Sequence, residues 1–145
     1  MAEPDISMKR VWDAPRAEVW KEWTEPARFA DWYGGAAAEV PVDTVSMDVR
    51  NGGAWQATMF AGGREIHWRG EYREVVEPER LVFTVTDEPG DVYDLITVVL
   101  TDLGDGRTEM LMEQSGGHMT PEQYGEAEKG WGVFFDRMAE RLAEG

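Results

Sequence analysis

Cysteine is absent from this chain of 145 residues. Without thiols the chain can form neither a disulfide framework nor a thiolate metal site, and this composition suits a reducing compartment. Histidine is nearly absent as well, because His67 and His118 are the only two. A metal site needs several ligands at matched spacing, and the sequence offers no such group, so we expect no metal and no other cofactor.

Basic residues are also scarce. Lys and Arg together number 14 against 29 Asp and Glu, which gives a formal net charge of −15. Phosphate backbones are bound by basic surfaces, so this charge excludes nucleic acid as a partner. The N-terminus lacks the basic and apolar pattern of a signal peptide, and no apolar run reaches the roughly 20 residues that span a bilayer. We therefore expect a cytoplasmic protein with no membrane insertion.

Aromatic side chains are what the sequence has in excess. It contains seven Trp, four Tyr and five Phe. Such large rings either fill a core or line a cavity, and the polar atoms of Trp and Tyr need partners when they are buried. The chain shows no internal repeat and no linker, and its length is typical of one domain, so we predict a single domain over residues 1–145.

A period of two residues dominates the centre of the chain and predicts strands. Turn signals such as Asn51-Gly52-Gly53 and Gly104-Asp105-Gly106 separate them. Such short connections imply antiparallel hairpins. The predicted strands are residues 6–12, 45–50, 54–60, 65–76, 80–87, 92–102 and 107–114.

Helices are predicted on either side of this region. Asp13 is expected to cap a first helix that starts near Pro15, and residues 27–32 form a second short one. Thr120 and Pro121 start a long C-terminal helix, whose apolar residues recur at three- and four-residue spacing. They are Tyr124, Ala127, Trp131, Phe134, Phe135, Met138 and Leu142. Gly130 and Gly132 inside this helix suggest that its backbone lies close to the sheet or to a bound molecule.

This order of elements predicts an α+β fold. A curved antiparallel sheet of about seven strands is expected to wrap around the long C-terminal helix, with two short helices between the first and second strands. This is the order of the helix-grip fold.

Several local motifs strengthen the prediction. They include Asp13-Ala14-Pro15, Trp23-Thr24-Glu25-Pro26, Trp32-Tyr33-Gly34, Gly70-Glu71-Tyr72-Arg73-Glu74-Val75, Pro78-Glu79-Arg80-Leu81-Val82-Phe83-Thr84 and Gly130-Trp131-Gly132. Over nearly its whole length the chain resembles the bacterial AHSA-type proteins (homologues of the activator of the heat-shock chaperone ATPase). These belong to the START-like, or SRPBCC, superfamily of polyketide cyclases and lipid-transport proteins. The resemblance implies a cavity between the concave sheet face and the C-terminal helix.

Strand parity and helical spacing give the candidate lining of that cavity. The predicted ligand-binding residues are Trp32, Tyr33, Trp55, Met59, Trp68, Tyr72, Met110, Met112, His118, Tyr124, Trp131, Phe135 and Met138. The segment Trp32-Tyr33, which precedes Gly34-Gly35, is expected to act as a lid. The alternative is that these side chains simply fill a core.

Two classes of function follow. The leading hypothesis is a protein that binds a small apolar or aromatic ligand without chemistry, because catalytic groups are scarce. The alternative is a cyclase- or isomerase-type enzyme acting on an aromatic or polyketide-like substrate, with His118, Tyr72 or Glu113 as acid or base. A stress-response role as an interaction domain with a chaperone partner rests on the resemblance alone, and a homodimer is left open.

Overall fold

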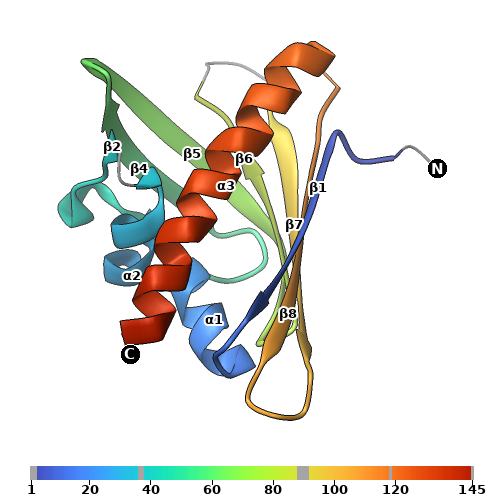
Figure 1. Cartoon of the computed structure of the whole chain (residues 1–145). Coiled ribbons are helices and arrows are strands. Elements are labelled where there is room, and N and C mark those ends of the chain that lie inside the picture. Colours follow the sequence, from blue (N-terminus) through green and yellow to red (C-terminus); the bar gives the residue numbers. More distant parts are fainter. Residues whose placement is uncertain (1–2, 36–37, 88–91, 118, 145) are drawn as a thin grey trace.

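The molecule is a curved antiparallel sheet that holds a long helix against its concave face (Figure 1). The computed structural model describes residues 3–35, 38–87, 92–117 and 119–144. The helices are α1 (Arg16–Thr24), α2 (Pro26–Trp32) and α3 (Pro121–Glu144), with a short 3₁₀ turn, η2, at Val42–Thr44. The strands are β1 (Ile6–Trp12), β2 (Ala38–Glu39), β3 (Ser46–Met47), β4 (Ala54–Ala61), β5 (Arg64–Val76), β6 (Arg80–Val85), β7 (Asp94–Asp102) and β8 (Thr108–Ser115). The predicted α+β architecture is therefore confirmed.

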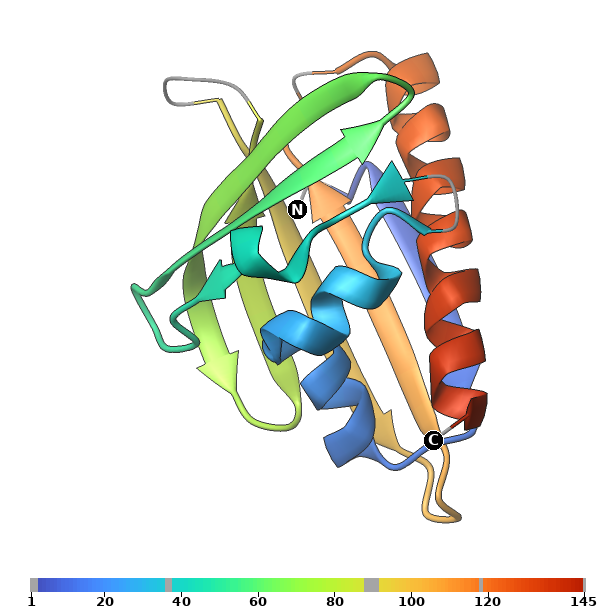
Figure 2. The ribbon, with the colours of Figure 1, turned by 90° about the vertical axis from the view of Figure 1, so that its left-hand side faces the viewer.

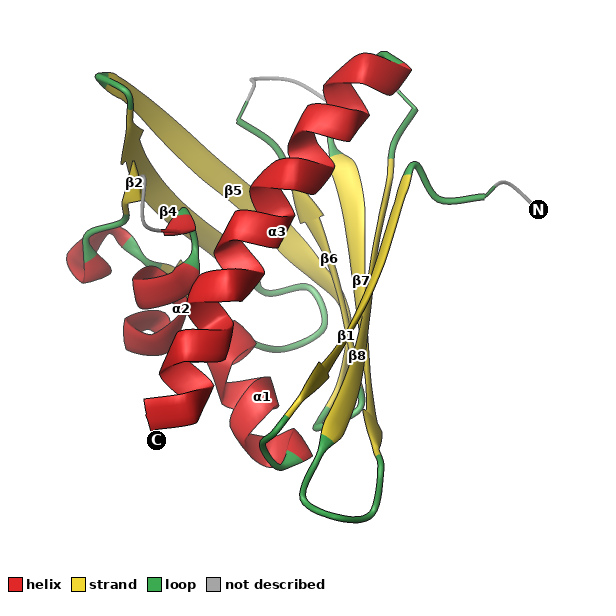
Figure 3. Ribbon diagram, in the orientation of Figure 1, coloured by secondary structure: helices red, strands yellow, loops and turns green. Residues whose placement is uncertain are grey.

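The sheet runs in the order β1-β8-β7-β6-β5-β4-β2, and β3 pairs with β4. Each neighbouring pair is antiparallel, and within the described residues the strands number eight. The register places Met8 opposite Met112, and Met112 opposite Val98, so these side chains share one face. That face is the buried one, because alternate residues of a strand point to opposite sides. All three helices lie within the curve of the sheet (Figure 3).

Helices α1 and α2 lie beside the C-terminal half of α3 over the concave face (Figure 2). Helix α1 turns Val19, Trp20 and Trp23 into the core, as its spacing predicts. The predicted cap at Asp13 is wrong: Pro15 occupies the N-cap position and no side chain caps the helix. Pro15 has the fixed φ of proline, and its carbonyl accepts hydrogen bonds from the backbone amides of Glu18 and Val19.

Helix α3 begins as the sequence predicts. The Gln123 amide donates to Thr120 Oγ1 (3.1 Å), and the Thr120 amide donates to Gln123 Oε1 (2.8 Å), which completes a capping box. The apolar stripe faces the sheet, and Trp131, Phe135 and Met138 are buried.

The interpretation of the α3 glycines as marks of close approach is wrong. A Cβ built on Gly130 would meet nothing within 4 Å, and one on Gly132 would meet only the Met8 methyl at 4.0 Å. The close approach lies in the sheet instead, where a Cβ on Gly70 would come within 1.8 Å of the Thr84 carbonyl oxygen.

Replacing Gly130 with alanine should therefore raise the free energy of unfolding by about 0.5–1 kcal/mol, because alanine favours the helix and restricts the unfolded chain. Gly70→Ala is the matched contrast and should destabilise strongly. Urea denaturation followed by circular dichroism measures both changes. A loss of stability in Gly130→Ala would show that the position carries a constraint beyond backbone freedom.

The strand predictions differ from the structure in one region. The predicted strand 45–50 shortens to β3, because the chain turns at Asp48, whose amide donates to the Ala54 carbonyl. Gly53 is required in this turn, since a Cβ there would lie 1.9 Å from the Asp48 carbonyl oxygen. The short strand β2 lies in a segment that the sequence predicts as a loop; its two residues pair with Phe60 and Ala61.

None of the helices in the described part of the chain combines the length and the apolar composition that crossing a bilayer requires.

Candidate functional site

The gap between the concave sheet face and α3 is filled by aromatic and methionine side chains. The structure brings twelve of the thirteen predicted ligand-binding residues into or against this one cluster. Eleven are buried and Trp68 is half-buried; they are Trp32, Tyr33, Trp55, Met59, Trp68, Tyr72, Met110, Met112, Tyr124, Trp131, Phe135 and Met138. The thirteenth, His118, lies outside the described residues. Their location inside the gap follows from strand parity and helical spacing; contact with a ligand stays a prediction.

Trp23 stands at the centre of the cluster, although the sequence analysis did not select it. Its ring centroid lies 4.8 Å from that of Trp32 and 6.1 Å from those of Phe83, Trp131 and Phe135. Most of these contacts are edge-on or tilted, as aromatic pairs prefer. The spacing of apolar residues in α1 indicates that Trp23 is a core residue. Only the fold shows that its ring contacts both the sheet, at Phe83, and α3, at Trp131 and Phe135.

A small cavity lies within the cluster. Its volume is about 10 Å³, room for about one water molecule. It is lined by Trp23, Phe29, Met47, Trp55, Tyr72 and Phe83. Sites for small molecules usually measure roughly 300–1,000 Å³. The predicted ligand-sized cavity is therefore not found in this gap, because the rings expected to line it fill it instead.

A larger depression lies elsewhere, over the first turns of α3. Its volume is about 660 Å³, and it is lined by Thr120, Glu122, Gln123, Gly125, Glu126 and Lys129. All six residues are exposed and most are polar, so this is an open surface and not an apolar pocket.

The segment predicted to act as a lid is packed against the cluster. Trp32 is fully buried, and its Nε1 donates to the Glu22 carbonyl at 2.7 Å. The Tyr33 ring stacks on Phe29 with centroids 4.5 Å apart. Gly34 and Gly35 adopt φ values of +102° and +65°, and a Cβ on Gly35 would lie 2.6 Å from Val133 Cγ1. The turn after α2 is thus packed tightly on α3, and the cluster is covered on this side.

The indole N–H groups of the cluster divide into two kinds. Four donate to protein acceptors: Trp12 to Met110 Sδ, Trp32 to the Glu22 carbonyl, Trp55 to the Thr84 carbonyl and Trp131 to Gln114 Oε1. The Nε1 atoms of Trp23 and Trp68 are buried and have no hydrogen-bond partner in the described part of the chain. Buried donors without partners are uncommon, since each loses its bond to water.

A chain of buried polar groups lies beneath the N-terminal part of α3. Trp131 Nε1 donates to Gln114 Oε1 (2.8 Å), and Gln114 Nε2 donates to Asp94 Oδ2 (2.6 Å). The Tyr124 hydroxyl donates to Asp94 Oδ1 at 3.4 Å. Asp94 is only 3% exposed, so a carboxylate sits inside the apolar gap, held by side chains from the sheet and from α3.

The acids and bases proposed from the sequence have different surroundings. Burial, together with the charge of Asp48, raises the pKa of Tyr72 above its usual 10, so its hydroxyl stays neutral at physiological pH. Burial and the Asp87 charge raise the pKa of Tyr33 in the same way. Glu113 lies on the convex face, opposite Ser7 and Thr97, and does not reach the gap. Of the proposed groups in the described residues, only Tyr72 lines the gap, as a hydroxyl that can donate but cannot act as a base.

His67 is an exposed residue of β5. Its Nε2 lies 2.8 Å from Glu65, and its side chain is 68% exposed. Within the described ranges, no group of three His, Asp or Glu side chains is placed to hold a metal ion.

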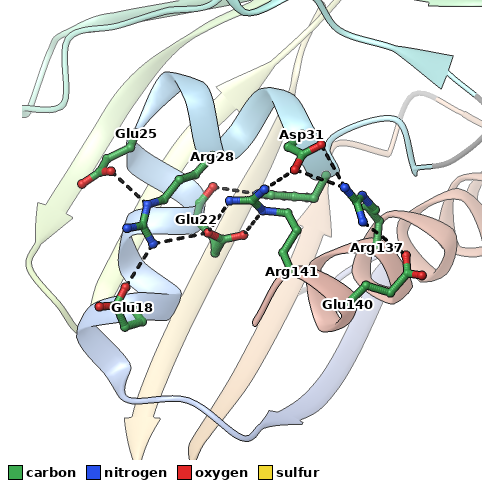
Figure 4. Close-up of polar contacts among 9 residues, drawn as sticks. Glu18, Glu22, Glu25, Arg28, Asp31, Arg137, Glu140 and Arg141 are labelled. Atoms are coloured by element: carbon green, nitrogen blue, oxygen red, sulfur yellow. Dashed lines mark hydrogen bonds and ion pairs between the residues drawn. The ribbon is translucent and has the colours of Figure 1, made fainter. Parts of the chain in front are cut away.

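An ionic cluster at the C-terminal end of α3 fastens the two short helices to it (Figure 4). Glu22 of α1 is 1% exposed and accepts hydrogen bonds from Arg141 Nε (2.7 Å) and Nη2 (3.3 Å). Arg28 lies 3.7 Å from the same carboxylate. Asp31 of α2 pairs with Arg141 and with Arg137. This cluster was not predicted from the sequence, since Glu22 and Arg141 are 119 residues apart.

The hydrogen bonds that Arg141 donates to the Glu22 carboxylate raise the pKa of Arg141, which is therefore charged at all ordinary pH values. Burial would raise the pKa of Asp31, but hydrogen bonds from Arg137 and Arg141 and their charges outweigh it and hold that pKa below 3.8.

Asp31 should consequently make stability depend on pH. Because its pKa is lower in the folded chain, its contribution is fully present above pH 4–5 and is lost as the pH falls below 3.8 through the folded-state pKa. The Asp31→Asn variant should thus lose less stability than the wild type between pH 5 and pH 3. Urea denaturation at several pH values measures the two slopes; parallel slopes would contradict this role of the ion pairs.

Comparison with known proteins agrees with this architecture. A profile of the family "Activator of Hsp90 ATPase homolog 1-like protein" matches residues 13–143. Among curated proteins, none matches the sequence significantly.

Solved structures give the same picture. A protein from Nitrosomonas europaea is 25% identical over 99% of this chain and 97% of its own, with a TM-score of 0.78. A protein from Chromobacterium violaceum is 24% identical over 94% of this chain and 95% of its own (TM-score 0.79). The AHSA1 protein from Silicibacter pomeroyi is 19% identical over 95% and 96% (TM-score 0.82). These structural similarities show that this chain and the three proteins share one fold.

Proposed function

Since the chain belongs to the activator of Hsp90 ATPase homolog 1-like family, whose START-like fold commonly binds ligands, we propose that it binds a small apolar or aromatic molecule between its sheet and α3. The observation that supports this most is the cavity beside Trp23, surrounded by the rings of Phe29, Trp55, Tyr72 and Phe83. Flat rings from α1, α2 and the sheet meet there without closing the space completely. A ring-sized ligand enters by displacing one of them.

Phe29 is the lining residue whose displacement we propose. It is the only one of the six that α2 supplies, and α2 ends at Trp32, the first residue of the expected lid. Displacing its ring would add roughly the volume of one benzene to the existing space. Burying that much apolar ligand surface favours binding by several kcal/mol at about 25 cal/mol per Å², before the entropic losses of association.

A fluorescence titration tests this proposal. Benzene, indane, naphthalene, 1-indanone and decanoate are added to the wild-type protein. At least one ring compound should quench tryptophan emission saturably with one site per chain, since ring stacking next to Trp23 and Trp55 changes their surroundings. If none of the five gives saturable quenching, and none raises the melting temperature, the proposal is wrong.

Acid–base chemistry is the second candidate, and Asp94 is the observation that favours it. A carboxylate at 3% exposure next to Gln114 and Tyr124 is the kind of group that catalytic sites use. In this case a bound substrate should be converted by the wild type and recovered unchanged from Asp94→Asn, as mass spectrometry of the extracted ligand would report. Equal conversion by both proteins would eliminate Asp94 as the reacting group.

Activation of a chaperone ATPase, which gives the family its name, stays a prediction, as does a homodimer.

A further inference from the structure

Trp23 carries a hydrogen-bond donor that the protein leaves unused. The side chain is 98% buried, since only 2% of the residue is exposed, and its Nε1 has no partner among the described residues. The same residue lines the small cavity. A buried N–H that lacks an acceptor loses its bond to water without compensation, and such groups call for a specific explanation.

The other indoles show that the chain satisfies this donor elsewhere. Trp55 lines the same cavity, yet its Nε1 donates to the Thr84 carbonyl at 2.9 Å. Trp131, which packs against Trp23, donates to Gln114 at 2.8 Å. Of the two indoles that line the cavity, Trp23 is therefore the one whose N–H forms no hydrogen bond among the described residues.

The remaining lining residues determine what kind of molecule can use it. Phe29, Met47 and Phe83 are apolar, and Tyr72 is a neutral hydroxyl. Among the residues that the structure describes, no charged side chain lines the cavity, so neither a cation nor an anion would find a counter-charge there, and burying an unpaired ion is costly. A neutral molecule that brings an acceptor oxygen would find both the rings and the donor.

On the basis of the proposed binding function, we infer that the ligand is a neutral aromatic carbonyl compound whose oxygen accepts a hydrogen bond from Trp23 Nε1. The aromatic ring replaces Phe29 against Trp55 and Phe83, and the carbonyl points to Trp23.

A matched pair of ligands tests this inference. 1-Indanone and indane have nearly the same size and shape and differ in the carbonyl group. The wild type should bind 1-indanone about five- to tenfold more tightly than indane, the effect of one neutral hydrogen bond. In the Trp23→Phe variant the ratio of the two affinities should fall below about twofold.

Trp55→Phe is the matched control, because it removes an indole from the same cavity wall whose N–H is already used. It should keep the preference for 1-indanone. Proton–nitrogen NMR spectra provide a readout that does not depend on affinity: 1-indanone, and not indane, should shift the Trp23 indole N–H resonance downfield.

The possible results distinguish failure of the acceptor requirement from failure of the proposed binding function. Equal affinity of the wild type for both compounds, with no selective shift of the Trp23 resonance, would overturn the acceptor requirement and leave the proposed function standing. Saturable binding of neither compound would overturn both. Loss of the preference in Trp55→Phe but not in Trp23→Phe would show that Trp55, and not Trp23, donates to the carbonyl oxygen. That result would also overturn the inference.

Discussion

The Trp131→Ala variant should lose about 3–5 kcal/mol of unfolding free energy. Trp131 is 7% exposed, and its ring packs against Trp23, Phe135 and Phe134. Truncation leaves a cavity between α3 and the sheet. It also removes the donor to Gln114, so a buried amide oxygen loses its partner.

Two further variants separate these contributions. Trp131→Phe keeps an aromatic ring but removes the donor, and should cost about 1–3 kcal/mol less than alanine. Val133→Ala, on the same helix at 46% exposure, should change stability by less than about 1 kcal/mol. Urea denaturation measures all three. A Trp131→Ala variant as stable as Val133→Ala would mean that α3 does not pack on the sheet in the way described.

The second large effect is expected at the ionic cluster. Arg141→Ala leaves the Glu22 carboxylate buried with only Arg28 nearby, at 3.7 Å. Removing one partner of a buried ion pair typically costs about 3–5 kcal/mol; with Arg28 still in reach we expect about 2–4 kcal/mol. The same change removes one of the two arginine partners of Asp31 and leaves only the pair with Arg137 among those described, so α2 should open more readily and a ring-sized ligand should bind and leave faster.

Lys129→Ala is the control for this charge removal. Lys129 pairs with Glu126 on the exposed side of α3, where both side chains are more than 75% exposed. Exposed pairs contribute little, so stability should change by less than about 0.5 kcal/mol. The double variant Glu22→Gln with Arg141→Ala should recover part of the lost stability, because no charge is then left unpaired. A loss as large in the double variant as in the single one would show that packing of the arginine, and not its charge, matters.

The elements that the sequence predicted correctly are those with local causes. The start of α3 follows from Thr120, Pro121 and Gln123, which act within one turn. The β4–β5 and β7–β8 hairpins follow from alternation and from glycine-containing turns, and the β5–β6 hairpin follows from alternation and the turn at Glu77-Pro78. The shortening of strand 45–50 depends instead on Asp48 pairing with Ala54 across a turn, which alternation alone does not reveal.

The candidate site was likewise predicted only as far as local sequence patterns determine it. Parity and spacing select side chains that face inward, and twelve of the thirteen selected residues do lie in or against the cluster. They do not give the volume left between the layers, so the sequence could not distinguish lining from filling. Trp23 and Glu22 were missed because their importance depends on contacts with Trp131 and Arg141, more than 100 residues away.

The central claim is that a small aromatic molecule enters the gap between the sheet and α3. An isotope-filtered NOE experiment on ¹³C-labelled protein saturated with unlabelled 1-indanone tests it most directly. We predict NOEs from the ligand protons to the Met47 methyl and to the rings of Phe29, Trp55 and Phe83, which surround the cavity. NOEs confined to exposed residues such as Val42 and Phe60, or no intermolecular NOEs at all, would contradict it.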